Sequence, residues 1–166
     1  MNTFKYFPNK FGEIQDLKEG QTVEGTVKNI TKFGAFVELD GGKVGLVRLE
    51  DLAVARTKNP SERIKIGQNV NIVVKSIDIS TGKINLSYKE HFGTWKENAD
   101  NFKERTNVHG IIRETEKNKN GIFIELAPNL VGMAEYQDGL NYGEEVNVFI
   151  KKIDYDKQKV KLVILK

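Results

Sequence analysis

Residues 28–51 read KNITKFGAFVELDGGKVGLVRLED, and this stretch predicts a β-hairpin. Two apolar runs flank Gly41-Gly42, and glycine supplies the turn because it adopts positive φ without steric cost. The run before the turn alternates apolar and polar residues from Ala35 to Leu39, which is the period of a half-buried strand. The hairpin therefore has one face toward a core and one face toward water.

The face toward water carries an aromatic and a basic side chain. Phe36 points to the same side as Glu38, away from Ala35 and Val37. By the same alternation, Arg48 points outward from the second strand of the hairpin. An exposed ring near an arginine is typical of surfaces on which nucleic-acid bases stack. The alternative is that Phe36 only closes the end of a small core.

The composition describes a soluble globular chain of 166 residues, with 39% hydrophobic and 30% charged residues. This length allows one ordinary domain or two small ones. The absence of cysteine excludes disulfides and thiolate chemistry and fits a reducing cytoplasm. No apolar run approaches the roughly 18 residues of a membrane span. The first 16 residues lack the apolar core of a signal peptide, so we expect a cytoplasmic protein without membrane association.

The positive charge is concentrated in the first half of the chain. Residues 17–90 contain 12 Lys or Arg against 9 Asp or Glu, whereas residues 91–166 contain 12 of each kind. The first half is therefore the better candidate for binding a polyanion.

Five short strands are predicted in residues 17–90, with one long polar connection between the third and the fourth. Such a pattern suits a small Greek-key barrel. The strands are expected at about residues 22–31, 33–39, 43–49, 69–78 and 83–88, and the connection at residues 50–66, with short turns at residues 50–52 and at Pro60.

The second half of the chain repeats the first. GQNVNIVVKSID at residues 67–78 aligns with GEEVNVFIKKID at residues 143–154, and FGAFVEL at residues 33–39 aligns with NGIFIEL at residues 120–126. Gly45-Leu46-Val47 likewise matches Gly132-Met133-Ala134. Two copies of one barrel are therefore predicted, with the long connection reduced to about residues 137–141 in the second copy.

Residues 91–106, HFGTWKENADNFKERT, predict a short helix between the two copies. Thr94 and Glu97 have the spacing of a capping box. Such a helix packs its apolar stripe on a barrel and fixes how the copies face each other; the alternative is a loose tether. The stripe consists of Phe92, Trp95, Ala99 and Phe102.

Three segments resemble the S-one (S1) domain. They are GTVKNITKFGAFVELDGGKVGLVRLEDL, IGQNV and IDISTGKINLSYKE. That domain is the RNA-binding OB-fold repeat of the largest small-subunit ribosomal protein, also found in polynucleotide phosphorylase and other RNA enzymes. The tandem with its Trp-bearing linker is similar to short bacterial, clostridia-like versions of that ribosomal protein.

The resemblance implies an all-β fold of two tandem five-stranded OB-fold Greek-key barrels joined by a short α-helix. The expected divisions are a strap or leader at residues 1–16, a first RNA-binding domain at 17–90, a helical linker at 91–106 and a second, divergent domain at 107–166.

The resemblance also assigns RNA-contacting residues to the first copy. The two phenylalanines of the family match Phe33 and Phe36, and its histidine corresponds to Arg48. Arginine keeps a donor, adds permanent charge and stacks on bases. The family's aspartate matches Asp78, and its basic residue opening the fifth strand matches Lys83. By charge alone, backbone phosphates are expected to contact Lys28, Lys32, Arg56 and Lys58; a plain solvated surface role is the alternative for these four.

The second copy departs from the pattern. Asn120 replaces the first phenylalanine and Glu135 stands at the arginine position, while Phe123, Asp154 and Lys159 persist. One stacking ring is missing and a negative charge is introduced. We therefore expect this copy to be mainly a protein-contact or scaffolding module, with weak RNA binding as the alternative.

Catalysis is not expected, and neither is a cofactor or a bound metal. Without cysteine, His91 and His109 cannot form a structural zinc site or a nucleophilic pair with cysteine. Asp154 and Asp156 fall between two predicted strands, which favours hairpin-turn residues over a cation loop.

Two functions follow as hypotheses. The first is binding of single-stranded RNA, chiefly messenger RNA, by a monomer that works in translation near the small ribosomal subunit. The second is a protein-interaction adaptor or targeting subunit of an RNA-processing or RNA-degrading complex.

Overall fold

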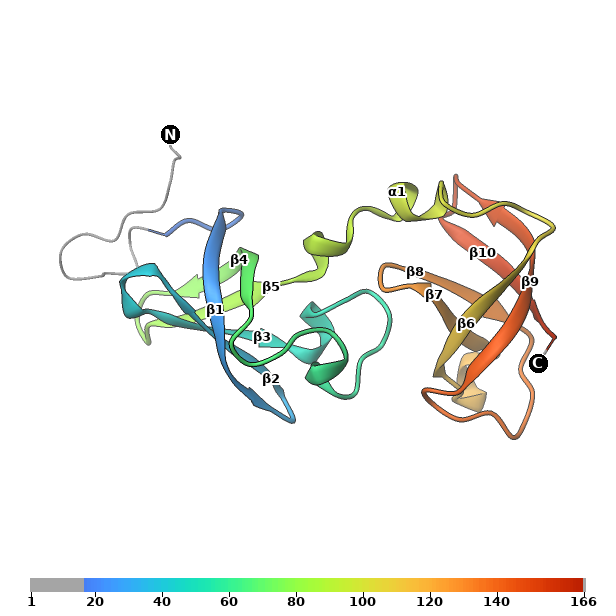
Figure 1. The fold of residues 1–166 in the computed structure, drawn as a ribbon, viewed down its shortest axis with the longest axis horizontal. Helices are drawn as coiled ribbons and strands as arrows, with labels where there is room; N and C mark the ends of the chain where they lie inside the picture. Colours follow the sequence, from blue (N-terminus) through green and yellow to red (C-terminus); the bar gives the residue numbers. More distant parts are fainter. Residues whose placement is uncertain (1–16, 166) are drawn as a thin grey trace. The chain divides into compact units, whose positions relative to one another are not determined.

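The computed structural model describes residues 17–165, which form two compact units (Figure 1). The first unit consists of residues 17–53 and Thr57–His91. The second consists of Val54–Arg56 and residues 92–165. The predicted strap or leader at residues 1–16 lies outside the described residues.

The first unit is a closed barrel of five strands in the order β1-β2-β3-β5-β4. All neighbouring pairs are antiparallel except β3 and β5, which are parallel. This is the predicted five-stranded Greek-key barrel of the OB type. The strands are β1 (Thr22–Thr31), β2 (Gly34–Leu39), β3 (Val44–Arg48), β4 (Asn69–Asp78) and β5 (Lys83–Ser87).

Alternate residues of these strands fill the barrel, as the hydrophobic pattern predicts. The fully buried side chains include Val27, Ala35, Val37, Val47 and Leu86. The long connection after β3 contains two short 3-10 helices, η3 (Leu49–Asp51) and η4 (Pro60–Glu62). Asn59 precedes η4, and its side chain accepts a hydrogen bond from the Ser61 backbone N–H at 3.0 Å. Both predicted turns are confirmed.

The hairpin turn between β2 and β3 also follows the prediction. The turn is a 3-10 segment, η2 (Asp40–Gly42), in which Gly41 and Gly42 have φ values of 87° and 83°. The Leu39 N–H donates to the Lys43 carbonyl at 2.7 Å and closes the hairpin. A residue with a Cβ is strained at such φ values, which explains the glycine pair.

The second unit contains a second closed barrel, in the order β10-β8-β7-β6-β9. A Cβ on Gly25 of β1 would lie 2.5 Å from Val37, and one on Gly110 of β6 would lie 2.5 Å from Ile124. The same close approach thus recurs at aligned positions, which confirms the repeat. The strands are β6 (Asn107–Glu114), β7 (Ile122–Ala127), β8 (Leu130–Ala134), β9 (Glu145–Asp154) and β10 (Lys159–Ile164), with a 3-10 segment η6 (Lys117–Lys119) after β6.

The linker helix packs on the second barrel. After a 3-10 turn, η5 (Lys89–Phe92), the helix α1 (Trp95–Ala99) begins with both hydrogen bonds of the predicted capping box. Ala99 lies within the second hydrophobic core, and Trp95 and Phe102 pack against it. Trp95 also contacts the ring of Tyr155 edge-on at 5.4 Å. The helix is therefore part of the second unit, and its predicted role in orienting the copies stays a prediction.

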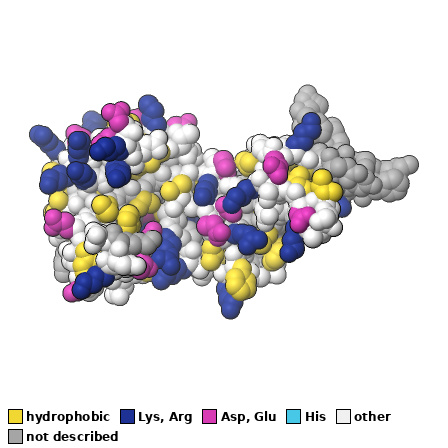
Figure 2. All heavy atoms as spheres, turned by 180° about the vertical axis from the view of Figure 1, so that it is seen from behind, with side chains coloured by type: hydrophobic (Ala, Val, Ile, Leu, Met, Phe, Trp, Pro, Cys, Tyr) yellow, Lys and Arg dark blue, Asp and Glu magenta, His cyan; other side chains and the backbone are white. Residues whose placement is uncertain are grey.

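The face of the molecule drawn in Figure 2 carries charged side chains of both signs. Figure 2 shows Lys and Arg side chains intermixed with Asp and Glu, with hydrophobic side chains between them. Within the described part of the chain, no helix is long and apolar enough to cross a membrane.

Candidate nucleic-acid interface

The outer surface of β2, β3 and β5 carries the predicted aromatic and basic residues, and we call it the aromatic face. Strand register defines its middle row, in which Phe36 lies opposite Leu46 and Leu46 lies opposite Asn85. The neighbours of Phe36 on β2, Ala35 and Val37, are fully buried, so Phe36 points outward. Its ring is half-buried. The prediction that this ring lies on the outer face is confirmed.

Phe33 lies just before β2 at one end of this face, and 68% of it is exposed. The Lys32 ammonium lies 5.2 Å from the centroid of the Phe33 ring, in a cation–π contact. Leu49 donates its backbone N–H to the Phe33 carbonyl at 3.2 Å, and exposed Arg48 lies opposite Gly34. One exposed ring and two cations thus meet at this end.

Gly34 makes this arrangement possible. A Cβ at Gly34 would lie 2.1 Å from the Val47 carbonyl oxygen, so β2 and β3 approach too closely here for any side chain. Every other amino acid at this position would push the two strands apart. Gly34 therefore holds Phe33 beside the end of β3.

Lys83 lies at the opposite end of the aromatic face. It is exposed and opens β5, opposite Asp78 on β4. The parallel register of β3 and β5 sets Lys83 about level with Val44, four residues from Arg48, which is about 13 Å along an extended strand. This length accommodates a few nucleotides of an extended strand.

Asp78 has a structural role in the turn between β4 and β5. Its carboxylate accepts hydrogen bonds from the Ser80 hydroxyl at 2.7 Å, the Ser80 N–H at 3.1 Å and the Thr81 N–H at 3.3 Å. Hydrogen bonds from Ser80 and Thr81 hold the pKa of the Asp78 carboxyl below its usual value. Asp78 therefore orders the loop that precedes Lys83.

The cations that charge alone predicted as phosphate contacts lie in different surroundings. The Lys28 ammonium lies 3.3 Å from Glu38, and both side chains are exposed. Arg56 belongs to the second unit and donates to Glu116 at 2.6 Å. The structure thus groups Arg56 with the second barrel. Lys58 is exposed in the connection after β3.

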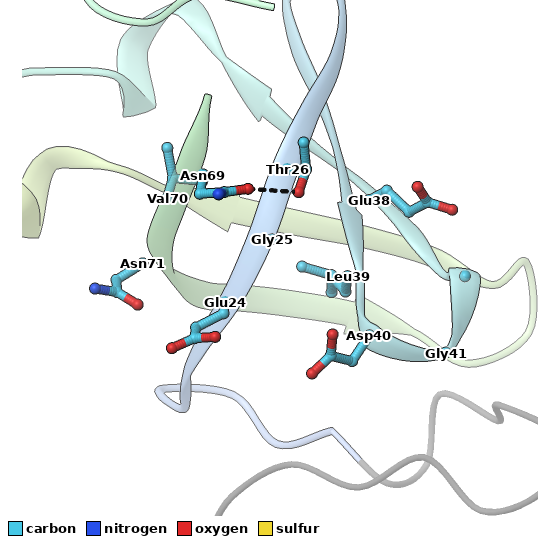
Figure 3. A pocket seen from close by; sticks show the side chains of 11 residues that line it. Glu24, Gly25, Thr26, Glu38, Leu39, Asp40, Gly41, Asn69, Val70 and Asn71 are labelled. Atoms are coloured by element: carbon cyan, nitrogen blue, oxygen red, sulfur yellow. Dashed lines mark hydrogen bonds between the residues drawn. The ribbon is translucent and has the colours of Figure 1, made fainter. Parts of the chain in front are cut away.

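An acidic hollow of about 720 Å³ lies between β1, β2 and β4 of the first barrel (Figure 3). Glu24, Glu38 and Asp40 line it, and no Lys or Arg is among its lining residues. The Thr26 hydroxyl and the Asn69 side chain share a 2.9 Å hydrogen bond across its wall. Three carboxylates repel phosphate, so this hollow is electrostatically unfavourable for nucleic acid.

The second barrel keeps part of the pattern. Phe123 on β7 is half-buried and lies opposite Met133 on β8. Asn120 is exposed in the left-handed region at φ 59°, and Glu135 is exposed after β8, as the departures from the family pattern imply.

Asp154 and Lys159 face each other across the ends of β9 and β10. The Lys157 N–H donates to Asp154 at 3.0 Å, and this bond is the main reason that the pKa of the Asp154 carboxyl is lowered. Asp154 thus repeats the turn-ordering role of Asp78.

Sequence reasoning did not include Leu46 and Asn85 among the site residues. Both alternate outward on their strands, so the hydrophobic pattern contained the signal. The Asn85 side chain donates to the Ser76 hydroxyl at 3.0 Å and extends the middle row onto β4. Among the residues that the structure describes, no group of three or more His, Cys, Asp or Glu side chains could hold a metal ion.

An OB-type barrel with outward aromatic rings and cations on one face is typical of one class of protein, the single-stranded nucleic-acid-binding modules. Comparison with known families agrees. Residues 16–89 match the family described as S1 RNA binding domain, and the chain carries a domain of this family.

The chain is homologous to the bacterial small ribosomal subunit protein bS1. The protein of that name from Staphylococcus aureus (strain MRSA252) is 34% identical over 163 residues, which cover 91% of this chain and 41% of the relative. The one from Rhizobium meliloti (strain 1021) is 33% identical and covers 90% of this chain and 28% of the relative. The chain therefore spans less than half the length of these relatives.

Among solved structures, GSP13 from Bacillus subtilis is similar at a TM-score of 0.45 and 27% identity, over 53% of this chain and 74% of that one.

Proposed function

We propose that the chain binds single-stranded RNA on the aromatic face of its first barrel. The observation that carries the proposal is Phe33, whose ring is 68% exposed and has a cation 5.2 Å above it. Single exposed apolar side chains such as Ile66 and Ile79 are ordinary, but Phe33 presents an aromatic ring beside a cation, and a base gains from stacking on such a ring.

The mechanism is stacking with electrostatic support. Two bases stack on Phe33 and Phe36, each for roughly 1–3 kcal/mol. Lys32, Arg48 and Lys83 contact phosphates or base edges along the same face, and Lys28 contributes less because Glu38 neutralises it. Stacking on a ring does not distinguish bases strongly, so sequence preference is small.

The cellular role is proposed from the relatives. Proteins named small ribosomal subunit protein bS1 support a role in translation, in which the chain holds messenger RNA near the small ribosomal subunit. The proposal includes a cytoplasmic monomer that has no catalytic activity of its own. It also keeps residues 17–90 and 107–166 as the two domains, with residues 91–106 as the linker.

Titration of fluorescently labelled single-stranded RNA tests the proposal. The parent chain is compared with a Phe33→Ala/Phe36→Ala variant, which we expect to bind at least about 30-fold more weakly because two rings are lost. Ile66→Ala is the matched control, since Ile66 is 64% exposed in the same unit and lies outside the aromatic face. The parent affinity should fall as salt rises.

Equal affinity of the parent and the double variant would reject the aromatic face. Failure of the parent to bind RNA at all would reject the function and favour the protein-interaction adaptor. Circular dichroism of each variant verifies that the barrels remain folded.

A further inference from the structure

A β-bulge in the second barrel brings three lysines together. Lys161 on β10 lies opposite Lys152 on β9, but Leu162 lies opposite Ile150, so Lys151 is an extra residue in β9. Lys151 and Lys152 therefore both oppose Lys161, and all three side chains are exposed. We call these residues the lysine bulge.

The lysine bulge is electrostatically unfavourable on its own. Like charges directly opposite each other on neighbouring strands destabilise a sheet. Within residues 17–165, no acidic side chain forms an ion pair with Lys151 or Lys161. Lys152 is partly compensated, because its charge contributes to the lowered pKa of Asp154. At least two ammonium groups are thus left facing solvent.

The first barrel has the same bulge and neutralises it. Leu86 lies opposite Val74 and Asn85 lies opposite Ser76, so Lys75 is the extra residue. The Lys75 ammonium donates to both oxygens of buried Asp51, at 2.9 and 3.1 Å. The aligned positions of Lys152 and Lys161 are Ser76 and Asn85, which hydrogen-bond to each other at 3.0 Å. A bulge of this fold therefore does not require unpaired cations.

The second barrel lacks the neutralising carboxylate. Asp138 aligns with Asp51, but it is exposed and accepts a hydrogen bond from the Tyr136 hydroxyl at 2.7 Å. Lys151 instead lines a hollow of about 400 Å³ together with Lys161.

This hollow combines positive charge with apolar surface. Met133 and Val163 line it and are 43% and 44% exposed. Phe123 lies beside Met133 in the strand register. The negative groups near it are Glu135, which lines the hollow, and Glu114, which lies opposite Phe123. On the side of the second unit seen in Figure 2, Lys and Arg side chains gather next to hydrophobic ones.

We propose that the lysine bulge and its hollow form a second RNA subsite, in which Lys151 and Lys161 bind backbone phosphates and Phe123 and Met133 support a base. Charge complementarity selects the ligand, because unpaired ammonium groups beside an apolar wall fit a phosphate chain with attached bases. The inference rests on the proposed binding of single-stranded RNA by this chain. It assigns Lys151, Lys161 and Met133, which the family pattern does not indicate.

Titration of RNA against variants of the full chain separates the two sites. In the Phe33→Ala/Phe36→Ala background, the remaining RNA binding should come from the second barrel. Adding Lys151→Gln/Lys161→Gln should weaken it roughly tenfold or more, and should lower the salt slope by about 1.4. Lys103→Gln/Lys117→Gln is the matched control, since it removes two exposed lysines from the second unit and neither residue lines the hollow.

Each outcome decides between the sites. If the control variant binds as weakly as Lys151→Gln/Lys161→Gln, or if both retain full binding, the subsite is rejected while the effect of the phenylalanine variant still stands. If the background variant binds no RNA, the subsite is also rejected. Trp95 fluorescence follows unfolding of the second unit, and the lysine variant should be at least as stable as the parent because a repulsion is removed. Binding of an acidic protein, and not of RNA, at the lysine bulge would overturn the proposal as well.

Discussion

One ion pair occurs in both barrels at aligned positions, but in different surroundings. Lys28 and Glu38 lie 3.3 Å apart on β1 and β2, with 56% and 40% of their side chains exposed. Arg113 and Glu125 lie 2.7 Å apart on β6 and β7, with only 5% and 7% exposed. The repeat thus conserves the position of the pair and changes its environment.

Tyr142 covers the pair in the second barrel. The Arg113 guanidinium donates to the Tyr142 hydroxyl at 3.0 Å and lies 5.2 Å from the centre of its ring. Lys28 and Arg113 carry the same charge at aligned positions, but their surroundings differ. The Arg113 side chain is buried, whereas the Lys28 side chain is exposed. The neutral charge balance of the second half does not reveal this difference, because a count of charges does not distinguish a buried arginine from an exposed lysine.

The largest expected loss of stability comes from breaking the buried ion pair of Arg113 and Glu125. Glu125→Gln leaves the Arg113 guanidinium buried without its counter-charge and should lower the free energy of unfolding of the second unit by about 3–5 kcal/mol. Urea unfolding followed by Trp95 fluorescence measures this, since Trp95 packs against the second core.

Glu38→Gln is the matched variant in the first barrel. Its pair is exposed, so the change in unfolding free energy should be about 1 kcal/mol or less. Circular dichroism in urea detects it. Equal losses in the two variants would show that burial does not distinguish the two pairs.

The next effect concerns the neutralised bulge of the first barrel. Asp51→Asn removes a buried carboxylate that accepts two hydrogen bonds from Lys75, and should lower the free energy of unfolding by about 1–3 kcal/mol. The same change frees the Lys75 ammonium, so the salt slope of RNA binding should rise. An unchanged slope would mean that an unpaired lysine at this bulge does not reach RNA.

A charge exchange sharpens the comparison of the two binding faces. Arg48→Glu gives the first barrel the residue that the second has at Glu135, and should weaken RNA binding roughly tenfold through the loss of a phosphate contact. Glu135→Arg should strengthen binding by the second barrel. Anisotropy titrations at two salt concentrations measure the affinity of both variants. Stronger binding by Arg48→Glu together with weaker binding by Glu135→Arg would exclude Arg48 from the interface.

The smallest effect is a pH dependence that both barrels share. Hydrogen bonds lower the pKa of Asp78 and Asp154 below the unfolded value of 3.8. A carboxyl with a lowered folded pKa contributes stability that is present above about pH 3.8 and is lost as the pH falls through the folded pKa. Carboxyl NMR shifts should report both values below 3.8, and Asp78→Asn should reduce the acid sensitivity of the first barrel only.

Much of the fold can be predicted because it depends on patterns formed by residues that are close together in the sequence. Alternation along 69–78, the Gly41-Gly42 turn and the capping box of Thr94 each depend on neighbours in the sequence, and each is confirmed. The outward direction of Phe36 follows from the same alternation. Phe33, expected at the start of the strand, instead lies with Lys32 in the two-residue turn between β1 and β2.

The remaining features depend on pairing between distant strands. The sequence of residues 151–161 contains several lysines, but only the register shift between β9 and β10 brings Lys151, Lys152 and Lys161 together. Similarly, Arg56 counts as a cation of the first copy in the sequence, yet it pairs with Glu116 in the second unit. Charge counts over a segment do not show which partner neutralises each charge.

Photo-crosslinking of single-stranded RNA to the full chain, with mass spectrometric mapping of the linked residues, tests the central claim most directly. We predict crosslinks at Phe33 and Phe36 on the aromatic face, lost in competition with unlabelled RNA. Crosslinks confined to the acidic hollow around Glu24 and Asp40, or absent from residues 33–36, would contradict it.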